Sequence, residues 1–271
     1  MVKKRGTKVK KINYLIFTDL DGTLLDDNCK FLDAIATLKK LKQKNIPVIF
    51  CSGKSFVEEN VFRKKMNINH PLITEDGSAI YIPKKYFKNK QGKLKGTYEH
   101  IHLGVDYSKI KKVIKKLGQH YHIQSYSNMT AKEVGKEMNL DLESAKRAKN
   151  RQLSETIIKA DKKALKELKK KFNVVIGGKA IHVYGKNTSK GKTVKILTKI
   201  YKEELGKVTT IGIGNSYNDE PMLRAVDKPA LVKNTNGKWA NIRIAKLYKA
   251  KNIGPKGWVE VVKKFVLKKD G

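Results

Sequence analysis

Apolar residues along this chain recur in two spacings, which predict strands and helices in turn. Apolar runs at residues 14–18 and 47–51 predict strands buried on both faces of a sheet. Within residues 31–44, apolar side chains recur every three or four positions, which predicts a helix. Strands that alternate with helices in this way predict a parallel sheet. The same pattern continues with a helix at residues 56–66 and strands at residues 72–74 and 79–82.

The character of the chain changes after residue 83. Residues 84–96 are polar and lysine-rich, and we expect a crossing segment or a hairpin loop there. Short candidate strands then mix with amphipathic helices, which predicts a separate α+β unit with an antiparallel sheet. The expected strands lie at residues 99–103, 122–126, 155–158, 174–176 and 180–184, and the expected helices at residues 108–117, 131–138, 142–150 and 162–171.

The alternation of buried strands and helices returns after residue 184. We therefore expect an α/β fold with a Rossmann-like parallel-sheet core, split into residues 1–83 and 185–271. The α+β unit at residues 84–184 is an insertion into this core, and two domains agree with the length of 271 residues. The second half of the core is expected to contain helices at residues 190–205, 220–226 and 258–267 and strands at residues 208–213 and 230–232.

The composition adds a strong positive charge, because 60 Lys and Arg stand against 25 Asp and Glu, a net +35. Such a charge attracts nucleic acid and anionic substrates. In residues 110–117 and 164–172, however, lysines lie opposite apolar positions at helical spacing, which predicts solvated helix faces. Aromatic residues do not interleave with the basic ones, so we expect a small-molecule substrate and no specific binding of nucleic acid.

Cysteine content and hydropathy bear on the compartment. Cys29 and Cys51 are the only cysteines, so no disulfide framework is predicted and a reducing cytoplasm is expected. No apolar run is long enough to span a bilayer, and we expect no membrane association. Residues 1–14 are basic and lack the apolar core of a secretory signal, so a short disordered extension is expected there. The oligomeric state stays open.

The candidate chemistry begins at the end of the first strand, where Asp19 and Asp21 stand one residue apart and precede Gly22. Ligands of open α/β sheets bind just beyond the carboxyl ends of parallel strands. Two carboxylates are costly to crowd at such a place unless a cation or the chemistry of an anionic substrate requires them. An ordinary Asp-Gly turn is the alternative explanation.

Three later segments place polar residues in comparable positions. Ser52 ends the second strand, where its hydroxyl and a backbone N–H can hold a phosphate oxygen. Lys190 begins a predicted helix, where a cation neutralises a phosphate and a nucleophile together. A later strand runs into a polar loop that contains Asn215 and Asp219. Each segment alone fits a turn or a solvated lysine, but the order of all four motifs indicates phosphate chemistry.

This ordered set resembles the signature of the haloacid-dehalogenase superfamily of phosphotransferases. The resemblance implies that Asp19 is the nucleophile, that Asp21 is the general acid and base, and that both help to hold Mg²⁺. Asn215 departs from the aspartate that is usual there, but an amide oxygen still ligates a hard cation. We therefore expect weaker binding of Mg²⁺, with Asp219 as the main acidic ligand from this loop. Lys190 and the serine of the second motif complete the implied catalytic set, and the position of the insertion matches the C2-type cap of the superfamily.

Segments across the whole chain, the insertion included, resemble one branch of this superfamily, the mannosyl-3-phosphoglycerate phosphatases. The resemblance implies a substrate with a phosphate, a carboxylate and a sugar, and a product that is a compatible solute. Gly53, Asp76, Lys179 and Asn215 depart from the residues usual in that branch, which leaves a mannosyl or a glucosyl group open. The matching segments are residues 73–83, 130–142, 151–157, 177–185, 189–192 and 212–223.

The resemblance also selects residues for substrate binding. Arg151 and Lys179 are the cations expected on the substrate carboxylate. Glu155 is the expected acceptor of sugar hydroxyls. Gly178 permits a close approach of the backbone to a ligand, and Gly53, next to the serine of the second motif, is assigned to substrate binding as well.

Two alternative functions stay open. The first is a general sugar phosphatase or a phosphomannomutase-like enzyme of the same superfamily. The second is a basic nucleic-acid-binding protein whose catalysis was weakened when Asn215 replaced an aspartate. A surface ion pair between Arg151 and Glu155 explains these two residues without a substrate. His182 alternates with apolar residues in a predicted strand and receives no role.

Overall fold

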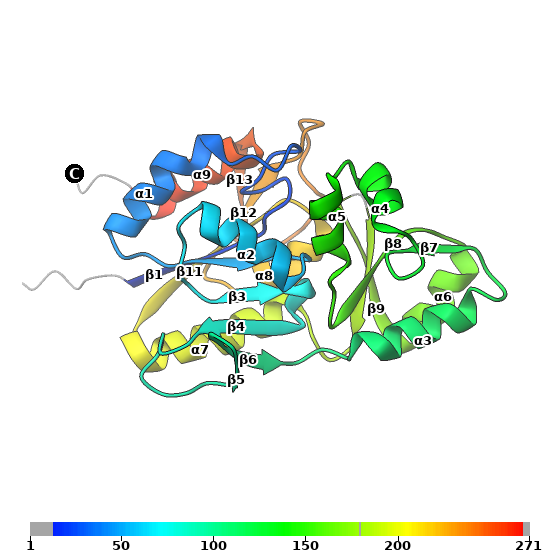
Figure 1. Ribbon diagram of the computed structural model, residues 1–271. Coiled ribbons are helices and arrows are strands. Elements are labelled where there is room, and N and C mark those ends of the chain that lie inside the picture. The colour runs from blue at the N-terminus through cyan, green and yellow to red at the C-terminus, as the bar shows by residue number, and fades with distance from the viewer. Residues whose placement is uncertain (1–12, 179, 268–271) are drawn as a thin grey trace, which may run out of the picture.

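A nine-stranded sheet forms the larger part of the protein (Figure 1). The computed structural model describes residues 13–178 and 180–267. The strands lie in the order β13-β12-β11-β1-β2-β3-β4-β6-β5. The first six are parallel, and β4, β6 and β5 form an antiparallel extension at one edge. Their bounds are β1 (Asn13–Thr18), β2 (Val48–Cys51), β3 (Leu72–Thr74), β4 (Ala79–Pro83), β5 (Lys93–Lys95), β6 (Tyr98–His102), β11 (Val208–Gly214), β12 (Lys228–Lys233) and β13 (Tyr248–Ile253).

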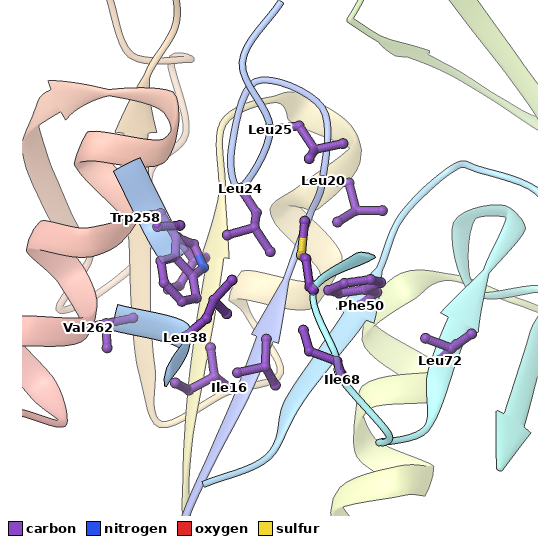
Figure 2. Close-up of a cluster of buried hydrophobic side chains, with 14 of the residues drawn as sticks. Ile16, Leu20, Leu24, Leu25, Leu38, Phe50, Ile68, Leu72, Trp258 and Val262 are labelled. Atoms are coloured by element: carbon purple, nitrogen blue, oxygen red, sulfur yellow. The ribbon is translucent and has the colours of Figure 1, made fainter. Parts of the chain in front are cut away.

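Helices cover both faces of this sheet, because successive strand residues point to opposite sides. In β1, Ile16 belongs to the same buried cluster as Trp258 of α9, which Figure 2 shows. Its neighbours Leu15 and Phe17 belong to a second cluster with Leu197 of α7. Burial of each such side chain contributes about 1.5–3 kcal/mol. The first face carries α1 (Ile35–Gln43), α2 (Phe56–Lys65) and α9 (Gly254–Phe265), and the second carries α7 (Lys190–Leu205) and α8 (Glu220–Leu223).

A four-stranded antiparallel sheet forms a second unit, with its strands in the order β7-β8-β10-β9. Helices α3 and α6 pack on it through buried residues such as Ile114 and Leu168. Lysines on the opposite sides of both helices are exposed, which confirms the predicted solvated faces. The elements are α3 (Tyr107–Leu117), β7 (Ile123–Ser125), α4 (Ala131–Met138), α5 (Leu142–Lys149), β8 (Ser154–Ala160), α6 (Lys162–Lys171), β9 (Phe172–Gly177) and β10 (Ala180–Gly185).

The larger sheet corrects the predicted start of the insertion at residue 84. The strand predicted at residues 99–103 as part of the insertion is β6, which pairs with β4 and β5 in the larger sheet. The chain leaves that sheet after His102 and returns at the end of β10. We infer that the segment between these points is a separate domain, because its elements bury hydrophobic clusters of their own.

Most other predicted elements are confirmed, and β3, α4, α6 and α7 have the predicted bounds. The sequence pattern does not predict β5 or β13, and α8 is shorter than the helix predicted at residues 220–226. The extension expected at residues 1–14 lies, up to residue 12, outside the described residues. Within the described ranges, no helix has the length and apolarity needed to cross a membrane.

The topology brings three strand ends together. β1 lies between β2 and β11, and Thr18 pairs with Ile213 near the end of β11. All three strands are parallel, so their carboxyl ends lie at one edge of the sheet. Asp19, Ser52 and Asn215 follow these ends and therefore come close together.

Candidate active site

Three charged side chains meet beyond the ends of β1 and β11. Nζ of Lys190, the first residue of α7, lies 2.8 Å from Oδ1 of Asp19 and 2.6 Å from Oδ1 of Asp219. Asp219 ends the 3-10 helix η3 (Tyr217–Asp219). Its Oδ2 accepts hydrogen bonds from the backbone N–H groups of Asn215 and Ser216. Three predicted site residues that are distant in sequence thus form one buried ion-pair group.

Burial governs the charge of this group, because Asp19 is 6% exposed and Asp219 is fully buried. Burial, together with the carboxylate of Asp219, raises the pKa of Asp19 to about 7, although Lys190 opposes the shift. Burial also disfavours the charged form of Lys190, but the two carboxylates outweigh it and hold its pKa well above the usual value. One ammonium group between two carboxylates leaves a net negative charge, which favours a further cation at this place.

Asp21 lies at the exposed end of the site. Its side chain is 60% exposed, and its Oδ2 lies 2.8 Å from Nζ of Lys54. Nζ of Lys54 also lies 3.8 Å from Oε1 of Glu58. Burial disfavours the charge of Lys54, but these carboxylates outweigh it and raise its pKa. Lys54 is not among the site residues predicted from the sequence, although its position two residues after Ser52 is a signal that would identify it.

Ser52 is buried directly after β2. Its hydroxyl donates a hydrogen bond of 2.7 Å to Oε1 of Glu59 and accepts one of 3.0 Å from the backbone N–H of Lys54. Glu59 lies in α2, and its burial raises its pKa well above the usual value. A neutral carboxyl group can donate its proton to the serine oxygen, which frees the serine hydroxyl to donate to a ligand.

Asn215 joins the loop after β11 to the loop after β1. Its Oδ1 accepts a hydrogen bond of 3.1 Å from Oγ1 of Thr23, and its Nδ2 donates one of 2.8 Å to Oδ1 of Asn234. Gly22 has no room for a side chain, because a Cβ there would lie 2.5 Å from Nδ2 of Asn215. The amide of Asn215 therefore lies directly against the loop that carries Asp19.

A cavity of about 450 Å³ opens between the larger sheet and the insertion. Its wall on the side of the larger sheet includes Asp19, Asp21, Lys54 and Asn215. The insertion contributes Tyr126, Met138, Arg151, Gly177, Gly178 and His182. This volume is in the range of small-molecule sites, and both predicted domains supply chemical groups to it.

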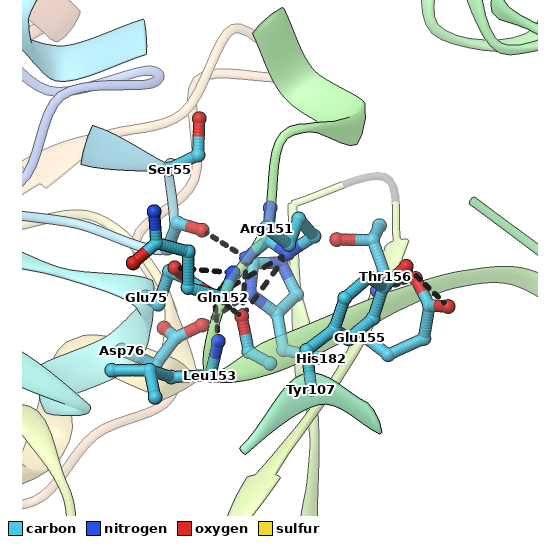
Figure 3. Close-up of polar contacts among 12 residues, drawn as sticks. Ser55, Glu75, Asp76, Tyr107, Arg151, Gln152, Leu153, Glu155, Thr156 and His182 are labelled. Atoms are coloured by element: carbon cyan, nitrogen blue, oxygen red, sulfur yellow. Dashed lines mark hydrogen bonds and ion pairs between the residues drawn. The ribbon is translucent and has the colours of Figure 1, made fainter. Parts of the chain in front are cut away.

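Arg151 lies at the junction of the two domains (Figure 3). Its Nη2 donates a hydrogen bond of 2.6 Å to the carbonyl oxygen of Gly53, and its Nε lies 4.0 Å from Oε2 of Glu75. Glu75 also accepts hydrogen bonds from the backbone N–H groups of Gln152 and Leu153. Arg151 is buried and lines the cavity, so the alternative of a surface ion pair does not describe it.

The other residues selected from the insertion lie in different places. Glu155 is fully buried and accepts hydrogen bonds from the hydroxyl of Tyr107 and the backbone N–H of Ser127. It is not among the residues that line the cavity, and Figure 3 shows its carboxylate beside Tyr107 and Thr156. Gly178 does line the cavity. Lys179 lies outside the described residues.

The structure adds a contact that the sequence pattern does not predict. Nδ1 of His182, in β10, lies 2.5 Å from Oδ2 of Asp76 in the 3-10 helix η2 (Glu75–Gly77). Burial disfavours the charge of Asp76, but His182 outweighs it and lowers the pKa of Asp76. The imidazole lies on Gly53, where a Cβ would be 2.4 Å from Cε1 of His182. A strand residue that alternates with apolar neighbours carries no local signal of such a contact.

The donor atoms near Asp19 fit a hard divalent cation. Within the described ranges, no three His, Cys, Asp or Glu side chains form a potential metal cluster. Mg²⁺, however, is commonly bound by only one or two carboxylates together with carbonyl oxygens and water. Asp19 supplies a carboxylate, the cavity wall includes Asp21 with its backbone carbonyl, and Asn215 supplies an amide oxygen. Asp219, expected as the main acidic ligand from this loop, is not among the residues that line the cavity, and both of its oxygens already accept hydrogen bonds. Asp19 does line the cavity.

Comparison with known proteins gives relatives whose names describe similar activities. The family model described as haloacid dehalogenase-like hydrolase matches residues 16–243. A protein of Persephonella marina, named glucosyl-3-phosphoglycerate/mannosyl-3-phosphoglycerate phosphatase, is 37% identical, with 92% of this chain and 95% of that one covered. A protein of Methanococcoides burtonii with the same name is 38% identical, with 91% and 95% covered. A mannosyl-3-phosphoglycerate phosphatase of Pyrococcus horikoshii is 37% identical, with 80% and 90% covered.

Solved structures share the fold at much lower sequence identity. A Thermoplasma acidophilum protein matches with a TM-score of 0.70 at 16% identity, covering 95% of this chain and 100% of the other. A haloacid dehalogenase-like hydrolase from B. subtilis matches with a TM-score of 0.64 at 17% identity, covering 93% and 99%. The likeness includes the inserted unit, because nearly the whole of each chain is covered.

Proposed function

Because the chain belongs to the haloacid dehalogenase-like hydrolases, we propose that it is a phosphatase of glucosyl-3-phosphoglycerate or mannosyl-3-phosphoglycerate. The products are the glycosylglycerate and inorganic phosphate. The relatives that match more than nine-tenths of this chain are named for both substrates, which supports this choice. We further propose a cytoplasmic location, which agrees with the two free thiols of Cys29 and Cys51.

The observation that carries the proposal is the ion pair of Lys190 with Asp19 at the wall of the cavity. Oδ1 of Asp19 is held by the ammonium group, so its second oxygen is available to a substrate in the cavity. A buried carboxylate with a fixed cation beside it is a suitable nucleophile for a phosphorus atom. The same cation reduces the repulsion between this carboxylate and the anionic phosphate.

The reaction proceeds in two displacements. The free oxygen of Asp19 attacks phosphorus, and the bond from phosphorus to the glycerate oxygen breaks as Asp21 gives its proton to the leaving alkoxide. Water then attacks the aspartyl-phosphate, Asp21 accepts a proton from that water, and phosphate leaves with the carboxylate of Asp19 restored. The exposed position of Asp21 at the cavity allows it to reach both the alkoxide and the water.

The phosphate site is built from the ends of β1, β2 and α7. Ser52 donates its hydroxyl, the backbone N–H of Gly53 adds a donor, and Lys190 supplies positive charge. Lys54 lies 2.8 Å from Asp21 and adds a second cation at the exposed side. We propose that Mg²⁺ is held by Asp19, the backbone carbonyl of Asp21 and the amide oxygen of Asn215. When bound, it would supply charge that stabilises the transferring phosphoryl group.

The insertion selects the rest of the substrate. Nε and Nη2 of Arg151 are used by Ser154 and Gly53, which leaves Nη1 as its donor toward the cavity. We propose that Arg151 contacts the glycerate carboxylate there, and that Gly178 allows the chain to approach the sugar. Lys179 stays a proposed second cation. Glu155 stays a proposed acceptor of sugar hydroxyls, although the structure turns its carboxylate toward Tyr107.

A substrate panel tests the proposal. Phosphate release would be measured with Mg²⁺ on glucosyl- and mannosyl-3-phosphoglycerate, on mannose 1-phosphate and on glucose 6-phosphate. We expect kcat/KM to be about 10- to 100-fold higher for the glycosyl-3-phosphoglycerates, because one charge-assisted contact to the carboxylate supplies a factor in this range. Equal values for the sugar monophosphates would favour the general sugar phosphatase, and no release from any ester would favour the binding protein without catalysis.

A further inference from the structure

His182, in the insertion, lies directly against the segment that follows β2, to which we assign the phosphate. Its ring occupies the space over Gly53, the residue directly after Ser52, where a Cβ would be 2.4 Å from Cε1 and 2.6 Å from Nδ1. The glycine therefore makes room for the imidazole. His182 also lines the cavity, with its side chain 14% exposed.

The two ring nitrogens of His182 have different surroundings. Nδ1 lies 2.5 Å from Oδ2 of Asp76, so an N–H on Nδ1 points at that carboxylate and fixes the orientation of the ring. Nε2 has no hydrogen-bond partner among the residues that the structure describes. It lies beside Gly177, which also lines the cavity.

Nε2 belongs to a group of nitrogen atoms from residues that line the cavity. A Cβ added at Gly177 would lie 3.1 Å from Nε2 of His182 and 3.1 Å from Nδ2 of Asn218, so Gly177 packs closely against both groups, and all three residues line the cavity. Arg151 also lines the cavity close to His182, because it donates a hydrogen bond to the carbonyl oxygen of Gly53, on which the imidazole lies. Side chains with three nitrogen groups thus line the cavity near Gly53, and such a set favours a ligand with anionic oxygens.

We propose that Nε2 of His182 donates a hydrogen bond to the carboxylate of the glycerate group, and that this residue thereby determines specificity for phosphoglycerate esters. The inference rests on the proposed function and names a contact within the same site. In a 3-phosphoglycerate ester only one carbon separates the carboxylate from the carbon that bears the phosphate. A side chain that lies on Gly53 is therefore within reach of the carboxylate when the phosphate lies beside Ser52.

Asp76 acts on this contact as a positioning residue. Oδ2 of Asp76 bonds to Nδ1 and so holds the ring in one orientation, in which Nε2 is the nitrogen left for the substrate. Asp76 is itself held by Asn218, whose Nδ2 donates to Oδ1 of Asp76 at 3.3 Å. The insertion, the turn at η2 and the loop after β11 thereby meet around one substrate group.

Substitution of His182 by Asn or by Gln tests the roles of its two ring nitrogens separately. His182→Asn keeps a donor near the position of Nδ1, which can still bond to Asp76, and removes the group at Nε2. The experiment measures kcat/KM of the full-length enzyme with Mg²⁺ on mannosyl-3-phosphoglycerate and on the analogue in which a hydroxymethyl group replaces the carboxylate. We expect the wild-type preference for the carboxylate substrate to fall by about 10- to 100-fold in His182→Asn. His182→Gln, which keeps a donor near Nε2, should retain more of that preference.

The exposed cap residue His120 provides the matched control, and His120→Asn should leave the preference unchanged. An unchanged preference in His182→Asn, with equal losses on both substrates, would overturn the inference and show that His182 only joins the domains. The wild-type enzyme alone tests the proposed function. If it hydrolyses small phosphate esters but does not prefer mannosyl-3-phosphoglycerate, that function is refuted before any variant is compared.

Discussion

The hydroxyl of Ser52 and the carboxyl group of Glu59 lie 2.7 Å apart in a part of the protein where both side chains are almost completely buried. Oε2 of Glu59 has no hydrogen-bond partner among the described residues. An ionised carboxylate without a second partner is costly at such a place. Glu59 is therefore held neutral beside the serine that we assign to the phosphate.

The first prediction concerns stability and pH at Glu59. Burial raises its pKa in the folded protein well above the ordinary 4.5, so the folded state binds a proton that the unfolded state has lost. Stability of the wild type should therefore fall relative to Glu59→Gln as pH rises above about 4.5, by up to about 1.4 kcal/mol per pH unit. Urea unfolding in EDTA across this range measures the difference. Glu143→Gln, an exposed change in the insertion, should show no such slope, and a difference at Glu59 that does not vary with pH would contradict the neutral carboxyl.

The second prediction concerns Lys190. Lys190→Met leaves the carboxylates of Asp19 and Asp219 buried without their shared cation. We expect the metal-free protein to lose about 3–5 kcal/mol of unfolding free energy. Adding Asp219→Asn should recover part of this loss, because one of the two unpaired charges is removed. Lys192→Met, at an exposed lysine in the same helix turn, should change stability by less than about 0.5 kcal/mol. Similar small effects at both lysines would show that the ion-pair group does not form.

The third prediction concerns the affinity for Mg²⁺. Asn215→Asp adds a charged oxygen to a donor set that contains an amide, so we expect the dissociation constant of Mg²⁺ to fall about tenfold, equivalent to about 1.4 kcal/mol. Calorimetric titration of the substrate-free enzyme measures this directly. Asn139→Asp adds the same charge at an exposed position of the insertion and serves as the control. Weaker binding in Asn215→Asp, or full wild-type activity in EDTA, would contradict the proposed metal site.

The fourth prediction concerns Arg151. Arg151→Ala should lower kcat/KM for glycosyl-3-phosphoglycerate about 10- to 100-fold more than for a small phosphate ester without a carboxylate. It should also reduce stability, because Glu75 loses a buried partner. Kinetics are therefore compared at a temperature at which both proteins are folded, with Arg243→Ala as an exposed control. The same fractional loss on both esters would make Arg151 a structural residue only.

The elements that the sequence predicts best carry their own local signals. α4 begins at a capping box of Thr130 and Glu133, and α7 combines a serine cap with a long amphipathic pattern. The two missed strands lie at sheet edges. All three residues of β5 are exposed, and in β13 only Ala250 is buried, so neither shows the apolar alternation of a half-buried strand.

The candidate site likewise contains residues that the sequence predicts and a contact that it does not predict. Asp19, Ser52, Lys190 and Asp219 follow predicted strand ends or begin a predicted helix, so their meeting follows from the topology. The contact between Asp76 and His182 spans 106 residues and depends on how the insertion lies over the larger sheet. No local pattern encodes that packing. The predicted start of the insertion was wrong for a related reason, since the sequence pattern of β6 does not show whether this strand pairs with β4 or with strands of the insertion.

The covalent intermediate on Asp19 tests the central claim most directly. Asp21→Asn should slow the second displacement, so a rapid-quench reaction with mannosyl-3-phosphoglycerate and Mg²⁺ should accumulate one phosphoryl group per protein. Mass spectrometry of the acid-quenched protein should place that group on the peptide that contains Asp19. If the phosphate of the substrate carries a label, the label should leave the protein when an excess of unlabelled substrate is added. Mannosylglycerate release without any phosphorylated protein in the wild type and in Asp21→Asn, or a phosphoryl group on another residue, would contradict the account.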